Sequence, residues 1–407
     1  MCKRGQPGRR RGTLADAEKT ASDAGEKAGR GMAQIDAVLD RARRGERLTL
    51  EDGLVLYDSN DIEKLGAAAH ERMLAFHPEF PITTFVIGRN VNYSNVCDTY
   101  CRFCAFYRPP DHPEGYVLDE ETIMQKIQEL VDVGGTELLM QGGTHPNLPL
   151  EYYLDLVRKI KARFPQVDIH SFSTIEIKKM SEVSGKSIEA VLRLLKEAGL
   201  GSLPGAGAEI LDDRIRLKIA KRKGSWREWI DIMETAHRVG LHTTATMVIG
   251  FGETVEERLL HMIRLRESQD RAKAIGAVGY LAFILWTFQP ENTHLPARKI
   301  GAEEYLKNLA IARLMIDNIP NFQTSWVTMG PEVGKLSLSY GCNDFGSTMI
   351  EENVVSAAAC TYKVNTNLIL DLIREAGRIP AQRNTKYQIL RIFREGERAE
   401  RDFIMQN

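Results

Sequence analysis

Strand-like and helix-like segments alternate along most of the chain, and this alternation limits its possible folds more than any other feature. The strand-like runs recur roughly every 30 to 50 residues, with a helical run between them. Strands joined in this way form right-handed βαβ units and a parallel sheet. The clear strand-like runs are 84–96, 137–143, 167–174, 201–211, 242–250 and 277–290. Two further runs, 322–330 and 335–341, would complete a set of eight.

The helical runs carry the end signals expected of helices. In 119–135 the residues Ile123, Ile127 and Leu130 share one face, and the run ends at glycine. Thr254 and Glu257 have the spacing of a capping box. No G-x-G-x-x-G follows the first strand, which disfavours an open dinucleotide-binding sheet. We therefore predict the α/β fold class, a (βα)8 TIM-type barrel with its active site at the carboxyl ends of the strands.

The domain organisation follows from changes in composition. Residues 1–31 are rich in Gly, Ala, Arg and Lys and nearly lack large apolar side chains, so we expect a disordered basic tail. Short N-terminal helices are expected over 32–76, the barrel over 77–390, and a C-terminal tail over 391–407.

Overall charge and hydropathy exclude several classes of partner. The 54 Lys and Arg residues balance 55 Asp and Glu residues, so we expect no binding to nucleic acid or acidic lipid. The longest nearly apolar run, 277–286, is half of the roughly 20 residues that a spanning helix needs, so no membrane segment is expected. Cys2, Cys342 and Cys360 show no disulfide framework, which favours a reducing cytoplasm.

The other three cysteines, Cys97, Cys101 and Cys104, fall within eight residues as C-x3-C-x2-C. A structural zinc site needs four ligands, and His112 is the nearest candidate for a fourth. Three unrelated buried thiols are a second interpretation. A four-iron cluster held by three thiolates is a third, and it leaves one iron open to chelate the amine and carboxylate of S-adenosylmethionine.

The C-x3-C-x2-C spacing resembles that of radical S-adenosylmethionine (SAM) enzymes. The resemblance implies a [4Fe-4S] cluster on Cys97, Cys101 and Cys104, with SAM as the second cofactor. The reduced cluster then delivers an electron to the sulfonium, giving methionine and a 5′-deoxyadenosyl radical. The implied electron donor is a flavodoxin or a ferredoxin.

Other strand ends resemble the SAM-binding motifs of that superfamily. Phe103 would lie beside the adenine, and Gly142 and Gly143 would approach the methionine amino group through bare backbone. The implied cofactor-binding residues are Phe103, Gln141, Gly142, Gly143, Ser171, Ser173, Glu209, Val248, Gly250 and Glu253. Alternatives remain open: an ordinary turn at Gln141–Gly143, a helix entrance at Glu253 and a solvated charge at Glu209.

From residue 35 to 387 the chain resembles the cyclic dehypoxanthine futalosine synthase family, radical SAM enzymes of the futalosine route to menaquinone. The resemblance is carried by "CRFCAFYR", "LMQGGTHPNLPLEYY", "IHSFS", "TTATM", "WTFQPENT", "DNIPNFQTSWVT", "NDFGSTMIEENVVSAA" and "PAQRNTKY". The last four stretches discriminate it from aminofutalosine synthase, and the deazaflavin (FO) synthase subunits are more distant. A zinc-stabilised barrel hydrolase is disfavoured because His145, His170 and His242 are single, with no H-x-H pair.

This resemblance implies a specific cyclisation. The radical removes the C4′ hydrogen from the ribose of dehypoxanthine futalosine, and the carbon radical then adds to the benzoate ring. Loss of an electron and a proton restores aromaticity.

The resemblance also implies substrate contacts and a proton acceptor. Arg383 would pair with the benzoate, because its fork fits a carboxylate. Asp344 and Glu209 are the expected catalytic carboxylates. The other expected substrate-binding residues are His145, Gln289, Glu291, Asn292, Thr293 and Asn343. For each of them a structural hydrogen bond in a loop is the alternative.

Overall fold

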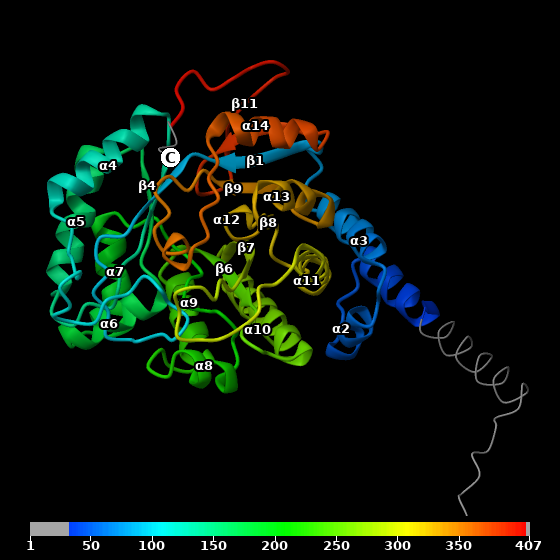
Figure 1. Ribbon diagram of the computed structural model, residues 1–407, viewed down its shortest axis with the longest axis horizontal. Coiled ribbons are helices and arrows are strands. Elements are labelled where there is room, and N and C mark those ends of the chain that lie inside the picture. Colours follow the sequence, from blue (N-terminus) through cyan, green and yellow to red (C-terminus); the bar gives the residue numbers. More distant parts are fainter. Residues whose placement is uncertain (1–31, 404–407) are drawn as a thin grey trace, which may run out of the picture.

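The structure is a computed structural model, and it describes residues 32–403 (Figure 1). Residues 32–43 are helical, and they are followed by α2 (Leu50–Tyr57) and α3 (Ile62–Leu74). These short helices pack on the outside of the fold, α2 against α10 (Val255–Ala274) and α3 against α11 (Ala302–Met315). The tail expected over 1–31 and the last residues of the expected C-terminal tail lie outside the described residues.

Parallel strands form a ring at the centre of the molecule, and every neighbouring pair in the ring is parallel. The first strand is interrupted at Ile87, so that its halves carry separate labels. The ring strands are β1 (Ile82–Val86) with β2 (Gly88–Val91), β3 (Glu137–Met140), β4 (Asp168–Ser171), β5 (Ser202–Leu203), β6 (His242–Ile249), β7 (Tyr280–Thr287), β8 (Asn321–Gln323) and β9 (Asp344–Ser347).

The interrupted first strand closes the ring. Its second half, β2, pairs with β3, and its first half, β1, pairs with β9 through Thr84 opposite Asp344. A bridge between Arg89 and Ile350 continues the second pairing along β2. The expected TIM-type barrel is thus confirmed.

Two more strands extend the sheet beyond the barrel. β10 (Ile379–Arg383) pairs in parallel with β1, and β11 (Ile389–Ile392) pairs antiparallel with β10. The domain boundary expected at residue 390 therefore lies inside a strand. α14 (Thr366–Glu375) precedes β10 and packs against it.

Helices surround the barrel and connect its strands (Figure 1). The capping box predicted at Thr254 and Glu257 is present at the start of α10. The remaining helices are α4 (Glu120–Asp132), α5 (Leu150–Arg163), α6 (Thr174–Ser184), α7 (Ile188–Ala198), α8 (Asp213–Ile219), α9 (Trp226–Arg238), α12 (Trp326–Met329), α13 (Pro331–Ser337), η1 (Leu338–Tyr340) and η2 (Ser356–Ala358).

The strand predicted over 335–341 is wrong, because this segment is helical through α13 and η1. Pro331 occupies the start of α13, where its fixed φ favours a helix, and Gly341 ends η1 at φ +101°. The last barrel strand is β9 instead. The strand predicted over 322–330 is correct only at its start, since β8 ends at Gln323 and α12 follows.

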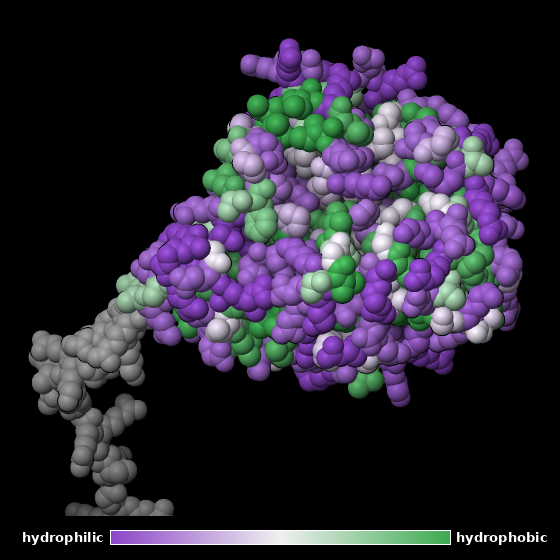
Figure 2. Space-filling view, turned by 180° about the vertical axis from the view of Figure 1, so that it is seen from behind, coloured by the Kyte–Doolittle hydropathy of each residue, from purple (hydrophilic) through white to green (hydrophobic). Residues whose placement is uncertain are grey.

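One face of the described part of the chain is mainly polar. Figure 2 shows one face on which hydrophilic side chains dominate and hydrophobic ones form small scattered groups. No helix within residues 32–403 is long and apolar enough to cross a membrane.

Candidate active site

The three clustered cysteines lie in the loop after β2, and hydrogen bonds within the loop hold it together. The Cys97 N–H donates to the Arg108 carbonyl (2.9 Å), and the Arg108 N–H donates to the Asn95 carbonyl (2.8 Å). The Arg108 guanidinium donates to the carbonyl oxygens of Ala105, Phe106 and Tyr107. The loop is therefore folded around the cysteines by its own backbone and by the Arg108 side chain.

All three cysteines are free thiols in one small region. Cys97 and Cys101 are buried, and Cys104 is half-buried. Burial raises the pKa of Cys101 to about 12, and the neighbouring Lys223 ammonium opposes that shift. The nearby Cys104 and Cys97 side chains raise the pKa of Cys101 further.

These thiols fit a cluster better than a single metal ion. Within residues 32–403 no three His, Cys, Asp or Glu side chains converge as ligands of one ion. This disfavours the zinc site completed by His112, whose Nδ1 accepts from the Glu114 N–H. A [4Fe-4S] cluster is wider than an ion, and each thiolate ligates a different iron, so its thiols need not meet at one point.

Gly142 and Gly143 follow β3 and pack directly against the cysteine loop. A Cβ at Gly143 would lie 2.1 Å from the Val96 carbonyl oxygen and 2.8 Å from the Cys97 Cβ. A Cβ at Gly142 would lie 2.6 Å from the Tyr93 ring. Close approach to the loop thus requires glycine at both positions, and it places Gln141–Gly143 beside the thiols.

Glu209 lies next to the cysteine loop in a buried ion pair. The Lys223 Nζ donates to its Oε1 over 2.7 Å, and both side chains are buried. The same ammonium lies 4.8 Å from the centre of the Phe103 ring. Glu209 is only 6% exposed, so it is not a solvated charge.

Val248, near the end of β6, and Glu253, just after the strand, differ in whether they face the barrel cavity. Val248 lines the barrel cavity. The Glu253 carboxylate accepts from the N–H groups of Gly250 (3.0 Å) and Phe251 (2.7 Å) and pairs with Arg258 (2.7 Å). Its partners close it off from the cavity, which agrees with the helix-entrance interpretation.

The two serines at the end of β4 and just beyond it differ in their contacts. The Ser173 backbone N–H and its hydroxyl both donate to the Glu176 carboxylate (2.7 and 2.6 Å), which caps α6. The Ser171 hydroxyl is buried, and it has no hydrogen-bond partner among the described residues. Neither serine lines the cavity.

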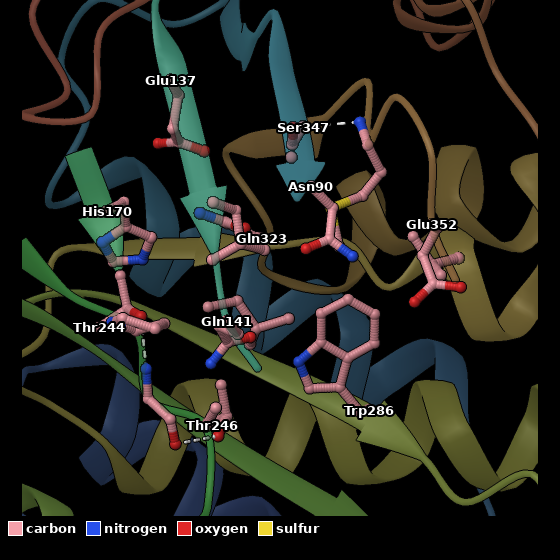
Figure 3. A pocket seen from close by; sticks show the side chains of 18 of the residues that line it. Asn90, Glu137, Gln141, His170, Thr244, Thr246, Trp286, Gln323, Ser347 and Glu352 are labelled. Atoms are coloured by element: carbon pink, nitrogen blue, oxygen red, sulfur yellow. Dashed lines mark hydrogen bonds between the residues drawn. The ribbon is translucent and has the colours of Figure 1, made fainter. Parts of the chain in front are cut away.

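A cavity of about 290 Å³ opens inside the ring of strands (Figure 3). It reaches from Glu137 at the start of β3 to Gln141 just past its end, which is about 13 Å along a strand. Trp286 and Ile284 of β7 supply apolar surface. The polar lining residues include Asn90, Thr244, Thr246, Gln323 and Ser347. The cavity therefore offers an apolar wall with polar groups around it, next to the cysteine loop.

The floor of the cavity carries a buried charge cluster. Arg383 donates through Nε and Nη2 to the two carboxylate oxygens of Asp344, over 2.5 and 3.0 Å. The Glu137 carboxylate lies 4.0 Å from the Arg383 Nη1, and burial raises its pKa. His170 stays neutral, because burial lowers its pKa to about 3, and its Nδ1 lies 2.6 Å from the Ser202 hydroxyl.

Six other expected substrate-binding residues do not line the cavity. Their side chains are engaged elsewhere, in ion pairs or structural hydrogen bonds. Glu291 pairs with Lys299 on the surface, for example, and the Asn343 amide bonds Asn321 and the Phe322 N–H below the barrel. The six are His145, Gln289, Glu291, Asn292, Thr293 and Asn343.

The structure adds three buried charged residues that the sequence analysis missed, Glu137, Glu176 and Lys223. The sequence did contain a signal for Glu137, because a carboxylate in an otherwise apolar strand is rarely buried without a partner. Glu176 stands three residues after Ser173, as in a capping box, but that spacing does not reveal its other contacts. Lys223 lies in the basic run 221–223, and nothing local distinguishes it.

Two segments of the chain match known families. Residues 91–265 match the radical SAM superfamily, and residues 277–396 match the CofH/MqnC C-terminal region. The first match contains the cysteine loop and the ends of β3 to β6. The second contains β7 to β11.

Full-length comparisons agree with these matches. The chain is 63% identical over 374 residues to cyclic dehypoxanthine futalosine synthase of Halalkalibacterium halodurans, covering 92% of this chain and 100% of that one. It is 38% identical over 364 residues to aminodeoxyfutalosine synthase of Thermus thermophilus, covering 88% and 96%. The fold resembles the FeFe-hydrogenase maturase HydG from Carboxydothermus hydrogenoformans, with a TM-score of 0.68, 15% identity and coverage of 91% and 84%.

Proposed function

The chain belongs to the cyclic dehypoxanthine futalosine synthase family of the radical SAM superfamily, and on this premise we propose that it converts dehypoxanthine futalosine to cyclic dehypoxanthine futalosine. The family resemblance indicated by the sequence is confirmed by the 63% identity across the whole relative. The product belongs to the futalosine route to menaquinone.

One observation carries the proposal in the structure: the barrel cavity and the cysteine loop share a wall. Gln141 lines the cavity, and the next two residues pack on Val96 and Cys97. Glu209 lines the cavity as well, and its partner Lys223 acts on Cys101. A substrate in the cavity therefore lies next to anything held by the loop.

The cofactors are assigned to residues that suit them. Cys97, Cys101 and Cys104 would hold the [4Fe-4S] cluster, and Gly142, Gly143 and Phe103 would contact SAM. When bound, the two cofactors would supply a radical that removes a hydrogen atom from the substrate. The family resemblance implies that this hydrogen is the one on the ribose C4′ atom.

The cavity floor supplies an anchor for the benzoate. Arg383 has five N–H donors, of which two bond Asp344 and one bonds the Asn384 carbonyl, so others remain for a ligand. Asp344 already balances the Arg383 charge, and an ionised Glu137 would repel a second carboxylate. The raised pKa of Glu137 favours its neutral form, which permits the benzoate to bind beside it.

Glu209 is better placed than Asp344 to accept the final proton. The Asp344 carboxylate is taken by Arg383, Thr84 and the Gly346 N–H, and it does not line the cavity. Glu209 lines the cavity, and Lys223 bonds only its Oε1. We therefore assign the proton to the Glu209 Oε2.

We also infer the setting in which the enzyme works. The described cysteines are all free, as expected of a reducing cytoplasm. The chemistry needs an external one-electron donor, and a flavodoxin or ferredoxin has a suitable potential.

An anaerobic turnover experiment tests the function. The reconstituted protein is given a reductant, SAM and dehypoxanthine futalosine, and the products are analysed by mass spectrometry. We expect 5′-deoxyadenosine together with a product two hydrogens lighter than the substrate. Cys101→Ser should abolish both, and the matched control Cys360→Ser, outside the loop, should not.

Other outcomes would overturn parts of the proposal. 5′-Deoxyadenosine without turnover of dehypoxanthine futalosine would retain the radical chemistry and reject the substrate. No cleavage of SAM by protein that carries the intact cluster would reject the superfamily chemistry for this chain.

A further inference from the structure

Glu176, in the first turn of α6, has a buried carboxylate that binds three segments of the candidate site together. Its Oε1 accepts from the Tyr93 hydroxyl (2.7 Å) and from the Gly142 N–H (2.9 Å). Its Oε2 accepts from the N–H and the hydroxyl of Ser173 (2.7 and 2.6 Å). The residue is 2% exposed. The carboxylate thus links the stem of the cysteine loop, the glycine turn after β3 and the start of α6.

These contacts exceed what a helix cap requires. Glu228 occupies the same place in the capping box of α9, but its side chain is half exposed and pairs with Lys178. No salt bridge among the described residues involves Glu176, so four neutral donors satisfy it instead. Burying a carboxylate without a cation is costly, and burial raises its pKa. A cap alone would not explain this arrangement.

The hydrogen bonds fix both peptide planes of the glycine turn. The Gly142 N–H points to Glu176, and the Gly143 N–H donates to the Ser94 carbonyl (2.9 Å). The Gln141 carbonyl accepts from the Asn92 amide, and the Gly143 carbonyl accepts from the His145 N–H. The Gly142 carbonyl accepts no hydrogen bond from the described residues, so it remains available for a ligand with N–H donors.

We propose that Glu176 is the positioning residue that orients the Gly142 carbonyl toward the methionine amino group of SAM. This role rests on the proposed function, which puts SAM at the glycine turn. An ammonium group needs acceptors, and a carbonyl held in one direction loses no conformational entropy when it binds. Glu176 anchors Gly142 through its N–H, and the Gly143 N–H bond to Ser94 sets the next peptide plane, which carries the Gly142 carbonyl. Glu176 thus positions the residue from which the carbonyl projects and does not itself touch the cofactor.

One substitution can separate the helix-capping role of Glu176 from its positioning role. In the capping box of α2 an aspartate, Asp52, accepts the Thr49 N–H over 2.8 Å. Glu176→Asp should therefore still cap α6 and keep the negative charge. Its shorter side chain cannot also reach Gly142, so the turn loses its anchor. The matched control is Glu228→Asp in the other Ser–Glu capping box.

Binding of SAM to reconstituted protein, without substrate, provides the test. We expect Glu176→Asp to hold as much iron and sulfide as the wild type but to bind SAM at least tenfold more weakly. The change that SAM produces in the EPR spectrum of the reduced cluster should require correspondingly more SAM. Glu228→Asp should match the wild type in both measurements.

The possible results are all decisive. Wild-type affinity in Glu176→Asp would overturn the role of Glu176 and leave the proposed function intact. If that variant loses its cluster, Tyr93→Phe removes one donor from the same carboxylate, and wild-type SAM affinity there would also overturn the role. Wild-type protein that binds SAM but makes no cyclic product would reject the proposed function alone. Wild-type protein that binds no SAM would reject both.

Discussion

Asp344 and Arg383 form a two-pronged ion pair at the floor of the barrel, with the Arg383 Nε and Nη2 at 2.5 and 3.0 Å from the two Asp344 oxygens. The pair joins β9 to the end of β10, and both side chains are almost fully buried. From the sequence we expected separate roles for the two residues, proton transfer for Asp344 and benzoate binding for Arg383. The structure shows that each is the main partner of the other.

Breaking this pair should destabilise the fold. Asp344→Asn leaves the buried Arg383 without its carboxylate, and removing one member of a buried pair costs about 3–5 kcal/mol. Glu137, 4.0 Å away, offsets part of that cost by ionising. Denaturant unfolding measures the change. Asp371→Asn, in an exposed pair with Arg398, is the control and should cost less than about 1 kcal/mol. Equal effects of the two substitutions would contradict the prediction.

Stability should fall as the pH drops below neutrality, because three histidines are buried in their neutral form. Burial lowers the pKa of His170 and His261 to about 3 and that of His237 to about 4. Above pH 6.5 neither the folded nor the unfolded state binds the extra proton. Between pH 6.5 and about 4 only the unfolded state binds it, so the free energy of unfolding decreases as the pH falls.

For His170 alone the loss between pH 6.5 and 5 is about 2 kcal/mol. His170→Gln should flatten the pH dependence by that amount in denaturant unfolding at the two pH values. The exposed His294 provides the control substitution, His294→Gln, which should leave the slope unchanged. An unchanged slope in His170→Gln would show that this side chain does not stay neutral in the fold.

Gly143→Ala should prevent the cysteine loop from holding its cluster. The new Cβ would overlap the Val96 carbonyl at 2.1 Å, and only movement of the loop backbone relieves that overlap. We expect iron and labile sulfide per chain to fall to a small fraction of the wild-type values after reconstitution. Gly301→Ala, where a Cβ meets nothing within 4 Å, is the control. Full cluster content in Gly143→Ala would mean that the loop does not need this close approach.

Trp286→Ala should weaken substrate binding without affecting SAM. Its indole lies in the wall of the cavity (Figure 3), and its loss removes a large apolar contact surface. We expect the KM for dehypoxanthine futalosine to rise about tenfold, or ~1.4 kcal/mol. Trp226→Ala, on the outer helix α9, should leave KM unchanged. A parallel loss of SAM affinity in Trp286→Ala would instead place the indole at the cofactor.

The accuracy with which the barrel strands could be predicted from the sequence varies along the chain. The early strands carry strong local patterns, and β2, β3, β4 and β6 form where they were expected. The last barrel strand was misplaced because Leu336, Ser337, Leu338 and Ser339 alternate as in a strand, although the segment is helical. β9 is only four residues long, and its ion pair with Arg383 depends on a strand 35 residues later.

The sequence by itself determined the barrel class, the glycine turn and the three clustered cysteines that we propose as cluster ligands. These features depend on spacing within a few residues or on a repeated pattern, and such information is local. Only the tertiary structure decided which partner each buried charged side chain contacts. Glu176 reaches Gly142, Lys223 reaches Glu209, and Arg383 reaches Asp344 across distances that no local pattern records. The partner of a buried charge is set by which strand ends the closed barrel brings together, because burial forces each charge to find a partner within hydrogen-bond reach.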